Sequence, residues 1–257
     1  MVAERESSFR AVIFDVDGVL VDSPHEAAWR EALAELMTGD WQELRSAGSW
    51  SDDAFTSEVY RQVLSGRPRM DGARAALEYF AVPDAERRAV DYADRKQARL
   101  LQLIDERRFR AFEDGVRFVA AVRAAGIAVA AASSSKNAGL FLRAIPAHDR
   151  PGETLLEQFD ADLSGRPVAH GKPDPELFLA AATELGVPAA ACVVVEDAIT
   201  GVQAAKAGGM AALGVARHGE AEDLARAGAD LVVSSLDEVD VAALTEGRLV
   251  LRTSRHG

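Results

Sequence analysis

Two aspartates near the N-terminus follow directly on a short apolar run. Residues 12–14 predict a buried strand, and Asp15 and Asp17 come at its carboxyl end in the string FDVDG. Open α/β sheets place their ligands at that end of their strands. A buried, unpaired carboxylate costs several kcal/mol or shifts its pKa, so this pair indicates cation binding or acid/base chemistry. A helix cap or a loop turn is the structural alternative for the pair taken alone.

Three further polar groups follow predicted strands later in the chain. They are the segment Ser133-Ser134-Ser135-Lys136-Asn137, Lys172 in the string HGKP, and the pair Glu196-Asp197. Each has a structural alternative, since a serine run can form a turn, a loop lysine can be solvated, and acidic residues suit a helix N-terminus. Together, four polar groups at strand ends of one sheet favour a catalytic site at one edge of that sheet.

Phosphoryl transfer is the chemistry that requires these side chains together. It needs a nucleophile, a proton shuttle, positive charge around the transferred group and hydrogen-bond donors that replace water. A carboxylate can serve as the nucleophile and form an aspartyl-phosphate. Carboxylate oxygens at two strand ends also suit Mg²⁺, whereas the sequence has no cluster of Cys and His residues of the kind that binds zinc.

Alternating strands and helices are predicted from about residue 111 onward. Expected strands cover 127–132, 159–163, 193–195, 210–215 and 231–234, and expected helices cover 114–125, 174–185, 198–207 and 220–227. Single helices between strands imply right-handed crossovers and a mostly parallel sheet with helices on both faces. The strand before Asp15 belongs to this sheet, so the predicted fold class is α/β.

A block of helical periodicity separates the first strand from this region. Helical segments are expected from about residue 25 and at 51–63, 73–80 and 84–107, with helix-start signals at Thr56-Ser57-Glu58 and Pro83-Asp84. The block interrupts the α/β region, so we expect a core domain of residues 1–24 and 111–257. Residues 25–110 are expected to form an inserted all-helical cap domain over the strand ends, and residues 145–158 a loop insertion.

Composition limits the classes of function. The 257 residues are 48% hydrophobic, which suffices for a packed core, and they contain no run of 18 apolar residues and no secretory h-region. We therefore expect a cytoplasmic protein without a membrane span. The one cysteine, Cys192, cannot form an internal disulfide. A net charge of −12 disfavours nucleic acid and anionic membranes as partners, so an anionic substrate would need local positive charge.

The four polar groups resemble, in order, the motifs of the haloacid dehalogenase-like (HAD) superfamily, and within it the β-phosphoglucomutase-like branch. The string FDVDGVLVDS is similar to the first motif, Ser133 to the second, and Lys172 to the third. The pair Glu196-Asp197 in VVVEDAITGVQAAKAGGM is similar to the fourth. The resemblance covers essentially all of the α/β portion and implies a Rossmann-like core with a helical cap.

Roles for the motif residues follow from the resemblance. It implies Asp15 as the nucleophile that becomes phosphorylated and Asp17 as the general acid and base. Ser133 and Lys172 would bind the transferred phosphoryl group. The implied ligands of Mg²⁺ are Asp15, the backbone carbonyl of Asp17, and Asp197, with Glu196 in or beside that shell.

The same resemblance implies substrate-binding residues in both predicted domains. In the core, the Ser-Lys-Asn segment is similar to the one that contacts the phosphate not being transferred in the mutases. In the cap, residues 65–69 resemble the loop that grips the sugar phosphate. The implied substrate-binding residues are His25, Gly66, Arg67, Arg69, Ser134, Ser135, Lys136 and Asn137. Ser65 and Pro68 depart from the lysine and serine of many mutases, and Arg67 can restore the missing positive charge.

Three functions are consistent with these residues. The first is a β-phosphoglucomutase-like interconversion of sugar 1-phosphate and 6-phosphate in carbohydrate metabolism, with cap closure excluding water. A phosphatase would use the same residues with water as the acceptor. A non-catalytic phosphosugar-binding module is the third, which the presence of every motif carboxylate disfavours. The expected partner is a small phosphorylated sugar, with no nucleic acid or membrane, and the protein is expected to be a monomer.

Overall fold

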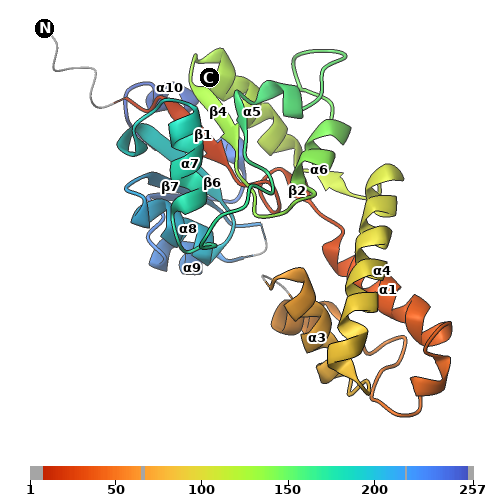
Figure 1. Cartoon of the computed structure of the whole chain (residues 1–257). Coiled ribbons are helices and arrows are strands. Elements are labelled where there is room, and N and C mark those ends of the chain that lie inside the picture. The colour runs from red at the N-terminus through yellow and green to blue at the C-terminus, as the bar shows by residue number, and fades with distance from the viewer. Residues whose placement is uncertain (1–7, 65–66, 218, 254–257) are drawn as a thin grey trace, which may run out of the picture. The chain divides into compact units, whose positions relative to one another are not determined.

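The computed structural model describes residues 8–64, 67–217 and 219–253. These residues form two compact units, one from the described parts of Met1–Ser23 and Arg110–Gly257 and the other from those of Pro24–Phe109. We call them the α/β unit and the helical unit (Figure 1). Each unit has a hydrophobic core cluster of its own.

A six-stranded sheet runs through the α/β unit, and all of its strand pairs are parallel. In spatial order its strands are β5 (Ala161–Asp162), β4 (Ala128–Ala131), β1 (Ala11–Phe14), β6 (Cys192–Glu196), β7 (Ala211–Val215) and β8 (Leu231–Val233). The predicted α/β fold with a mostly parallel sheet is therefore confirmed. The strand expected at 159–163 is shorter than predicted, since Phe159 leaves the sheet and its ring packs against Phe14.

β1 occupies the centre of the sheet because both of its edges are paired. Phe14 is in register with Ala131 of β4 on one side and with Val195 of β6 on the other. The chain adds β4 and β5 on one side of β1 and β6 to β8 on the other, so the strand order reverses beside β1. In sheets of this kind, ligands bind at that reversal, outside the carboxyl ends of the strands.

Helices flank the sheet (Figure 1). They are α5 (Glu113–Ala124), α6 (Ala138–Ala144), α7 (Glu176–Glu184), α8 (Ile199–Ala207), α9 (Ala221–Arg226) and α10 (Val241–Leu244). On one face, Ile13 shares a core cluster with Phe178 of α7 and Val202 of α8. On the other, Phe14 lies edge-on to Phe118 of α5, with ring centroids 5.9 Å apart. Coverage on both faces explains why β1 is apolar at every position.

Several short elements of the α/β unit were not predicted from the sequence. Besides α6, they are the antiparallel pair β2 (Val21–Asp22) and β3 (Arg110–Ala111) and the 3₁₀ helices η4 (Leu156–Gln158), η5 (Ala189–Ala191) and η6 (Leu236–Glu238). The expected loop 145–158 is closed by a hydrogen bond from Leu155 N to Ile145 O at 2.7 Å. Elements of two or three residues carry too few positions to establish a periodicity.

The helical unit is built around a core that joins its first and last long helices. Its elements are α1 (His25–Thr38), η2 (Gln42–Leu44), α2 (Ser57–Val59), the π-helix η3 (Tyr60–Leu64), α3 (Arg69–Tyr79) and α4 (Ala85–Asp105). Tyr92 of α4 is fully buried and its ring centroid lies 4.9 Å from that of Trp29 in α1. The Tyr92 hydroxyl donates a hydrogen bond to the Trp29 carbonyl at 2.9 Å.

Two predicted helical segments in this unit have other bounds than expected. The segment expected to be helical from about residue 51 is helical only from Ser57, at the predicted start signal. Thr56 caps this helix by accepting a hydrogen bond from Val59 N at 3.3 Å. The helix expected from residue 73 begins at Arg69, so this arginine stands in a first helical turn and not in a loop. Gly66, named above as a substrate-binding residue, lies outside the described residues.

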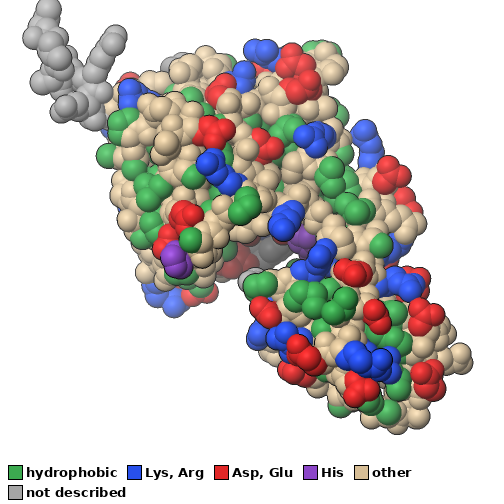
Figure 2. All heavy atoms as spheres, in the orientation of Figure 1, with side chains coloured by type: hydrophobic (Ala, Val, Ile, Leu, Met, Phe, Trp, Pro, Cys, Tyr) green, Lys and Arg blue, Asp and Glu red, His purple; other side chains and the backbone are tan. Residues whose placement is uncertain are grey.

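Ion pairs cover the surface of the helical unit. On the face drawn in Figure 2, acidic and basic side chains alternate over this unit. Arg95 contacts both Glu35 and Asp40, the latter at 3.0 Å. Exposed pairs of this kind contribute only about 0–1 kcal/mol each. Within residues 8–64, 67–217 and 219–253, no helix combines the length and hydropathy that a membrane span requires.

The buried hydroxyl of Tyr92 provides a test of the helical core. The substitution Tyr92→Phe removes this hydroxyl and leaves the buried Trp29 carbonyl without its hydrogen-bond donor. We expect the free energy of unfolding to fall by about 1–3 kcal/mol. Tyr79→Phe, at a side chain that is 52% exposed, is the control and should change it little. Denaturant unfolding measures both, and equal values for the two variants would contradict the prediction.

Candidate active site

Two carboxylates lie side by side because β1 and β6 are neighbours. Phe14 is in register with Val195, so Asp15 and Glu196 are the next residues on adjacent strands. Asp15 N donates a hydrogen bond to Val195 O at 3.0 Å, which extends the ladder to the end of β1. Asp15 is 6% exposed and Glu196 is 1% exposed. The sheet therefore buries two acidic groups at the edge where its ligand site is expected.

Lys172 supplies the positive charge for both of them. Its Nζ atom lies 2.6 Å from Asp15 Oδ1 and also contacts Glu196 Oε1. The ammonium group lies 4.8 Å from the ring centroid of Phe178. The Lys172 side chain is 13% exposed, so the ion pairs are largely shielded from water.

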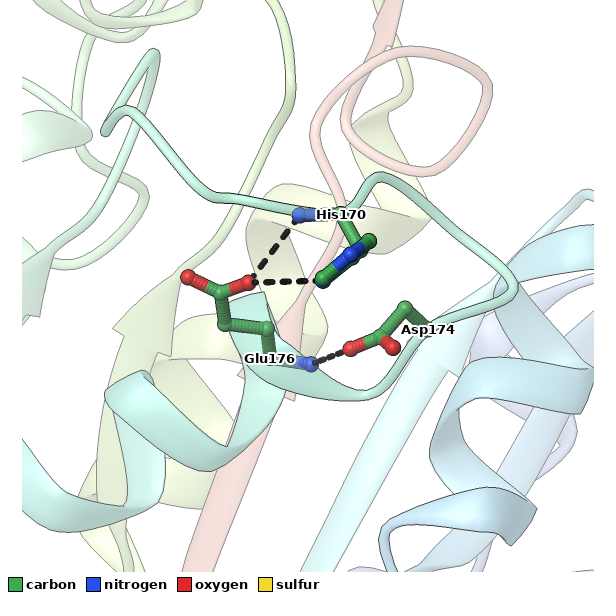
Figure 3. A group of neighbouring side chains, drawn as sticks. All are labelled: His170, Asp174 and Glu176. Atoms are coloured by element: carbon green, nitrogen blue, oxygen red, sulfur yellow. Dashed lines mark hydrogen bonds and ion pairs between the residues drawn. The ribbon is translucent and has the colours of Figure 1, made fainter.

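The carboxylates of Asp174 and Glu176 shape the segment that carries Lys172, residues 169–175; we call this segment the lysine loop. Figure 3 shows that Glu176 lies beneath the backbone of His170, while Asp174 points to the start of α7. Glu176 accepts hydrogen bonds from His170 N at 3.1 Å and from Ala169 N at 2.9 Å. Asp174 Oδ1 accepts one from Glu176 N at 3.0 Å. A cation could be held by the side chains of His170, Asp174 and Glu176, which lie close together. Both carboxylates, however, already accept hydrogen bonds from backbone N–H groups.

The two acidic residues at the end of β6 have different surroundings. Glu196 Oε2 accepts hydrogen bonds from Asp197 N and Ala198 N, both at 3.0 Å, so this carboxylate is fully engaged. A Cβ on Gly201 would lie 1.9 Å from Glu196 Oε1, and a Cβ on Gly18 would lie 1.9 Å from Asp197 Oδ2. Glycine is therefore required at both positions if the two side chains are to stay in place.

Negative charge exceeds positive charge among these residues. Burial raises the pKa of Asp15 to about 7, against the opposing effect of Lys172, and Glu196 and Asp17 add to the rise. Burial, Glu196, Asp15 and Asp17 raise the pKa of Asp197 well above its usual value. For Lys172, burial alone would lower the pKa, but the charges of Asp15 and Glu196 outweigh it and raise the pKa.

A divalent cation fits this donor set. Asp15, Glu196 and Asp197 each offer an oxygen, and these oxygens all lie within 4.8 Å of one another. Hard cations such as Mg²⁺ prefer oxygen ligands, and a double positive charge would offset the excess of carboxylates. Because both oxygens of Glu196 are already engaged, Asp15 and Asp197 are the more available ligands.

The serine segment after β4 forms the neighbouring part of the edge. Ser133 is 3% exposed, and its Oγ accepts a hydrogen bond from Ser135 N at 3.2 Å. Ser135 Oγ accepts one from Asn137 N at 3.3 Å, whereas Ser134 and Lys136 are exposed. The segment is thus a turn built by serine hydroxyls, and it follows the strand that pairs with β1.

The other predicted substrate-binding residues belong to the helical unit. His25 opens α1 and lies 3.2 Å from Lys96 Nζ through its Nδ1. Burial, and then the charge of Lys96, lower the pKa of His25 to about 3, which keeps the ring neutral. Arg69 donates a hydrogen bond to Gln97 at 3.1 Å, and Arg67 is exposed.

Sequence reasoning missed residues that contact predicted site residues or shape the segments that carry them. Lys96 is 5% exposed and lies on the apolar side of α4. A lysine on an apolar helical stripe is unusual, and that signal was available in the sequence. Glu176 and Gly201 have no comparable signal, since their importance depends on which backbone atoms they approach.

Comparisons with known proteins identify the family and the relatives of the chain. A model of the haloacid dehalogenase-like hydrolase family matches residues 9–209. The β-phosphoglucomutase of Mycobacterium bovis is 34% identical over 251 residues, which cover 90% of this chain and 91% of that protein.

Two solved structures are similar over nearly the whole chain. An archaeal β-phosphoglucomutase from Pyrococcus sp. strain ST 04 has a TM-score of 0.68 and 28% identity, over 91% of this chain and 96% of that one. CbbY from Rhodobacter sphaeroides in complex with phosphate has a TM-score of 0.69 and 27% identity, over 89% of this chain and 95% of that one. A mutant of that CbbY was solved with xylulose 1,5-bisphosphate.

The close approach at Gly201 gives a prediction for stability. A methyl group in Gly201→Ala overlaps Glu196 Oε1, and the carboxylate must move away from Lys172 or strain α8. We expect a loss of about 1–3 kcal/mol in the free energy of unfolding. Gly139→Ala in α6 is the matched control, because its Cβ would meet only Asp162 Oδ2 at 3.5 Å. That variant should be neutral or slightly more stable, since alanine favours helices.

The carboxylate of Glu176 should stabilise the lysine loop only while it is ionised. Hydrogen bonds from Ala169 N and His170 N lower the pKa of Glu176. A lowered pKa in the folded state adds stability above the unfolded pKa of about 4.3 and loses it as the pH falls. We expect Glu176→Gln to unfold at a lower temperature than the wild type at pH 7, with a smaller difference near pH 4. A difference that does not change with pH would contradict this.

Proposed function

The chain belongs to the haloacid dehalogenase-like hydrolase family, and on that premise we propose that it catalyses Mg²⁺-dependent phosphoryl transfer through an aspartyl-phosphate on Asp15. The proposed reaction is a β-phosphoglucomutase-like interconversion of a sugar 1-phosphate and a sugar 6-phosphate. The observation that carries the proposal is the contact of Lys172 with both Asp15 and Glu196 at the carboxyl edge of β1 and β6. The 34% identity to a β-phosphoglucomutase supports the choice of reaction.

In this proposal Asp15 is the nucleophile. One of its oxygens, Oδ1, is held by Lys172, so the carboxylate has a fixed orientation. The other oxygen attacks phosphorus, and the bond from phosphorus to the leaving oxygen breaks. Asp17 donates a proton to that oxygen. In the return step Asp17 removes a proton from the attacking hydroxyl group, and the phosphoryl group leaves Asp15.

The charges of the site suit a phosphoryl group. When bound, Mg²⁺ supplies the positive charge that the excess of carboxylates lacks; its proposed ligands are Asp15, Asp197 and the backbone carbonyl of Asp17, with Glu196 beside them. Lys172 and the Ser133 hydroxyl are proposed to bind the oxygens of the transferred group. Lys172 reaches the site as a preformed ion pair, so little reorganisation is required when charge develops.

The substrate is proposed to be a small phosphorylated sugar. Ser135, Lys136 and Asn137 are proposed to contact a second phosphate, and Ser134 is proposed to bind the substrate beside them. The substrate-binding residues proposed in the helical unit are His25, Gly66, Arg67 and Arg69. Arginine can bind a phosphate through two parallel hydrogen bonds. The structural likeness to a CbbY solved with phosphate and with a sugar bisphosphate supports this class of substrate.

A phosphatase is the alternative within the same chemistry. It differs only in the acceptor, which would be water. Many mutases have lysine and serine where this chain has Ser65 and Pro68. These differences fall on the segment implied to grip the sugar, and they support the phosphatase as an alternative. Magnesium, cytoplasmic location and a monomeric state remain parts of the proposal.

One incubation separates the two reactions. The protein is mixed with Mg²⁺, β-glucose 1-phosphate and a trace of β-glucose 1,6-bisphosphate, and glucose 6-phosphate and free phosphate are measured together. We expect glucose 6-phosphate to form with little free phosphate. Release of one phosphate per substrate without glucose 6-phosphate would replace the mutase by the phosphatase. Chelation of Mg²⁺ should abolish either activity.

Two substitutions test the assigned roles. Asp15→Asn should abolish both turnover and labelling of the protein by a phosphoryl donor, because no carboxylate remains to accept the group. Asp17→Asn should lower kcat about 10²–10⁴-fold while the phosphoryl-binding residues stay in place. Asp22→Asn, at an exposed carboxylate paired with Arg110, is the control. Full activity of Asp15→Asn would refute the proposed nucleophile.

A further inference from the structure

Arg217 lies after β7 and reaches across the end of the sheet to the loop that carries Asp17. We call that loop, residues 15–20, the aspartate loop. Arg217 Nη2 donates a hydrogen bond to Val19 O at 3.0 Å, and Arg217 Nε donates one to Gly18 O at 3.3 Å. The side chain is only 9% exposed. The guanidinium is nearly buried and donates two hydrogen bonds to carbonyls of the same loop. It therefore fixes the backbone of that loop.

A second set of contacts fixes Arg217 itself. Its Nη1 atom donates to Asp114 Oδ2 at 2.7 Å, and its Cζ atom lies 4.1 Å from the ring centroid of Phe112. Asp114 Oδ2 also accepts hydrogen bonds from Leu236 N at 2.8 Å and Ser235 Oγ at 3.0 Å. The guanidinium is therefore held by Asp114 of α5, which is held in turn by η6, while it holds the aspartate loop.

The held backbone lies beside the residues of the proposed reaction. Gly18 N, which shares a peptide group with the Asp17 carbonyl, donates to Val21 O at 2.8 Å. Because Arg217 also donates a hydrogen bond to Gly18 O, the peptide groups on both sides of Gly18 are fixed. Gly18 also lies against Asp197, since a Cβ there would meet Asp197 Oδ2 at 1.9 Å. A shift of Gly18 would therefore move the Asp17 carbonyl and alter the space available to Asp197.

We propose that Arg217 is a positioning residue for phosphoryl transfer, which holds the aspartate loop so that Asp17 and Asp197 keep their places relative to Asp15. The inference rests on the proposed function. Arginine suits this role because its planar fork can serve two carbonyls and a carboxylate at once. A lysine has one nitrogen and cannot reproduce those directions, so the exchange is not conservative here.

The test compares Arg217→Lys and Arg217→Met with Arg117→Met. Arg117 is the matched control, because it forms a bidentate pair with Asp237, at 3.1 and 2.6 Å, that joins the same two elements, α5 and η6. Three measurements are made on each folded protein: kcat and KM, Mg²⁺ affinity by calorimetry without substrate, and the unfolding midpoint.

We expect both Arg217 variants to bind Mg²⁺ about 10–100-fold more weakly and kcat to fall by a similar factor. Substitution of residues that orient metal ligands usually has an effect of this size. KM should change less than kcat, since the phosphate-binding residues are untouched. Arg117→Met should stay within about twofold of the wild type in both measurements while its unfolding midpoint falls.

Wild-type Mg²⁺ affinity and kcat in Arg217→Lys would overturn the inference, and so would losses of equal size in Arg117→Met. If Arg217→Met does not fold, Arg217→Lys decides; if that variant does not fold either, the role is structural and the inference fails. A wild type that binds Mg²⁺ but transfers no phosphoryl group would refute the proposed function, and the calorimetric comparison would still decide the role of Arg217. No Mg²⁺ binding and no transfer in the wild type would refute both.

Discussion

The structure depends on one balance of charge, in which a single buried ammonium group faces several carboxylates. Lys172 contacts Asp15 and Glu196 directly, and Asp17 and Asp197 add negative charge close by. Removing charged groups from water is costly unless they are paired, so this arrangement is an expensive one for a protein to build. Lys172 holds the Asp15 carboxylate, and two backbone N–H groups hold that of Glu196. A site with an unmet demand for positive charge is also prepared to receive a cation and a phosphoryl group.

In the α/β unit, backbone contacts hold these charged groups in place more than side-chain pairs do. The parallel register of β1 and β6 sets Asp15 beside Glu196. The lysine loop is shaped by the Glu176 carboxylate, and Glu196 is held by two N–H groups at the start of α8. Glycines at 18 and 201 leave the room that two carboxylates require. Backbone groups suit this task because their positions are already set by the sheet and its helices.

The fold class and the cluster of polar residues at the sheet edge could be predicted from the sequence, because both depend on patterns of residues that are close together in the sequence. A buried apolar run followed by polar residues indicates a strand end, and parallel strands bring such ends to one edge. The contacts of Arg217 with Asp114 and Gly18 could not be predicted in this way, because they join segments that are distant in sequence. Residues 51–56 were expected to be helical and are not, because apolar residues such as Phe55 pack into the core without helical structure. Periodicity reports burial, and burial does not require a helix.

The central position of β1 also has a consequence for how the chain acquires its structure during synthesis. Val12 pairs with Val193, which is made roughly 180 residues later, or about 10–40 s at ribosomal rates. Until then the N-terminal strand has no partner on one of its edges, whereas all of the helical unit has already been made. The helical unit can therefore fold first, and the strand that precedes Asp15 is enclosed late. Long-range pairing of this kind slows folding and leaves an apolar strand open to aggregation or to chaperones in the meantime.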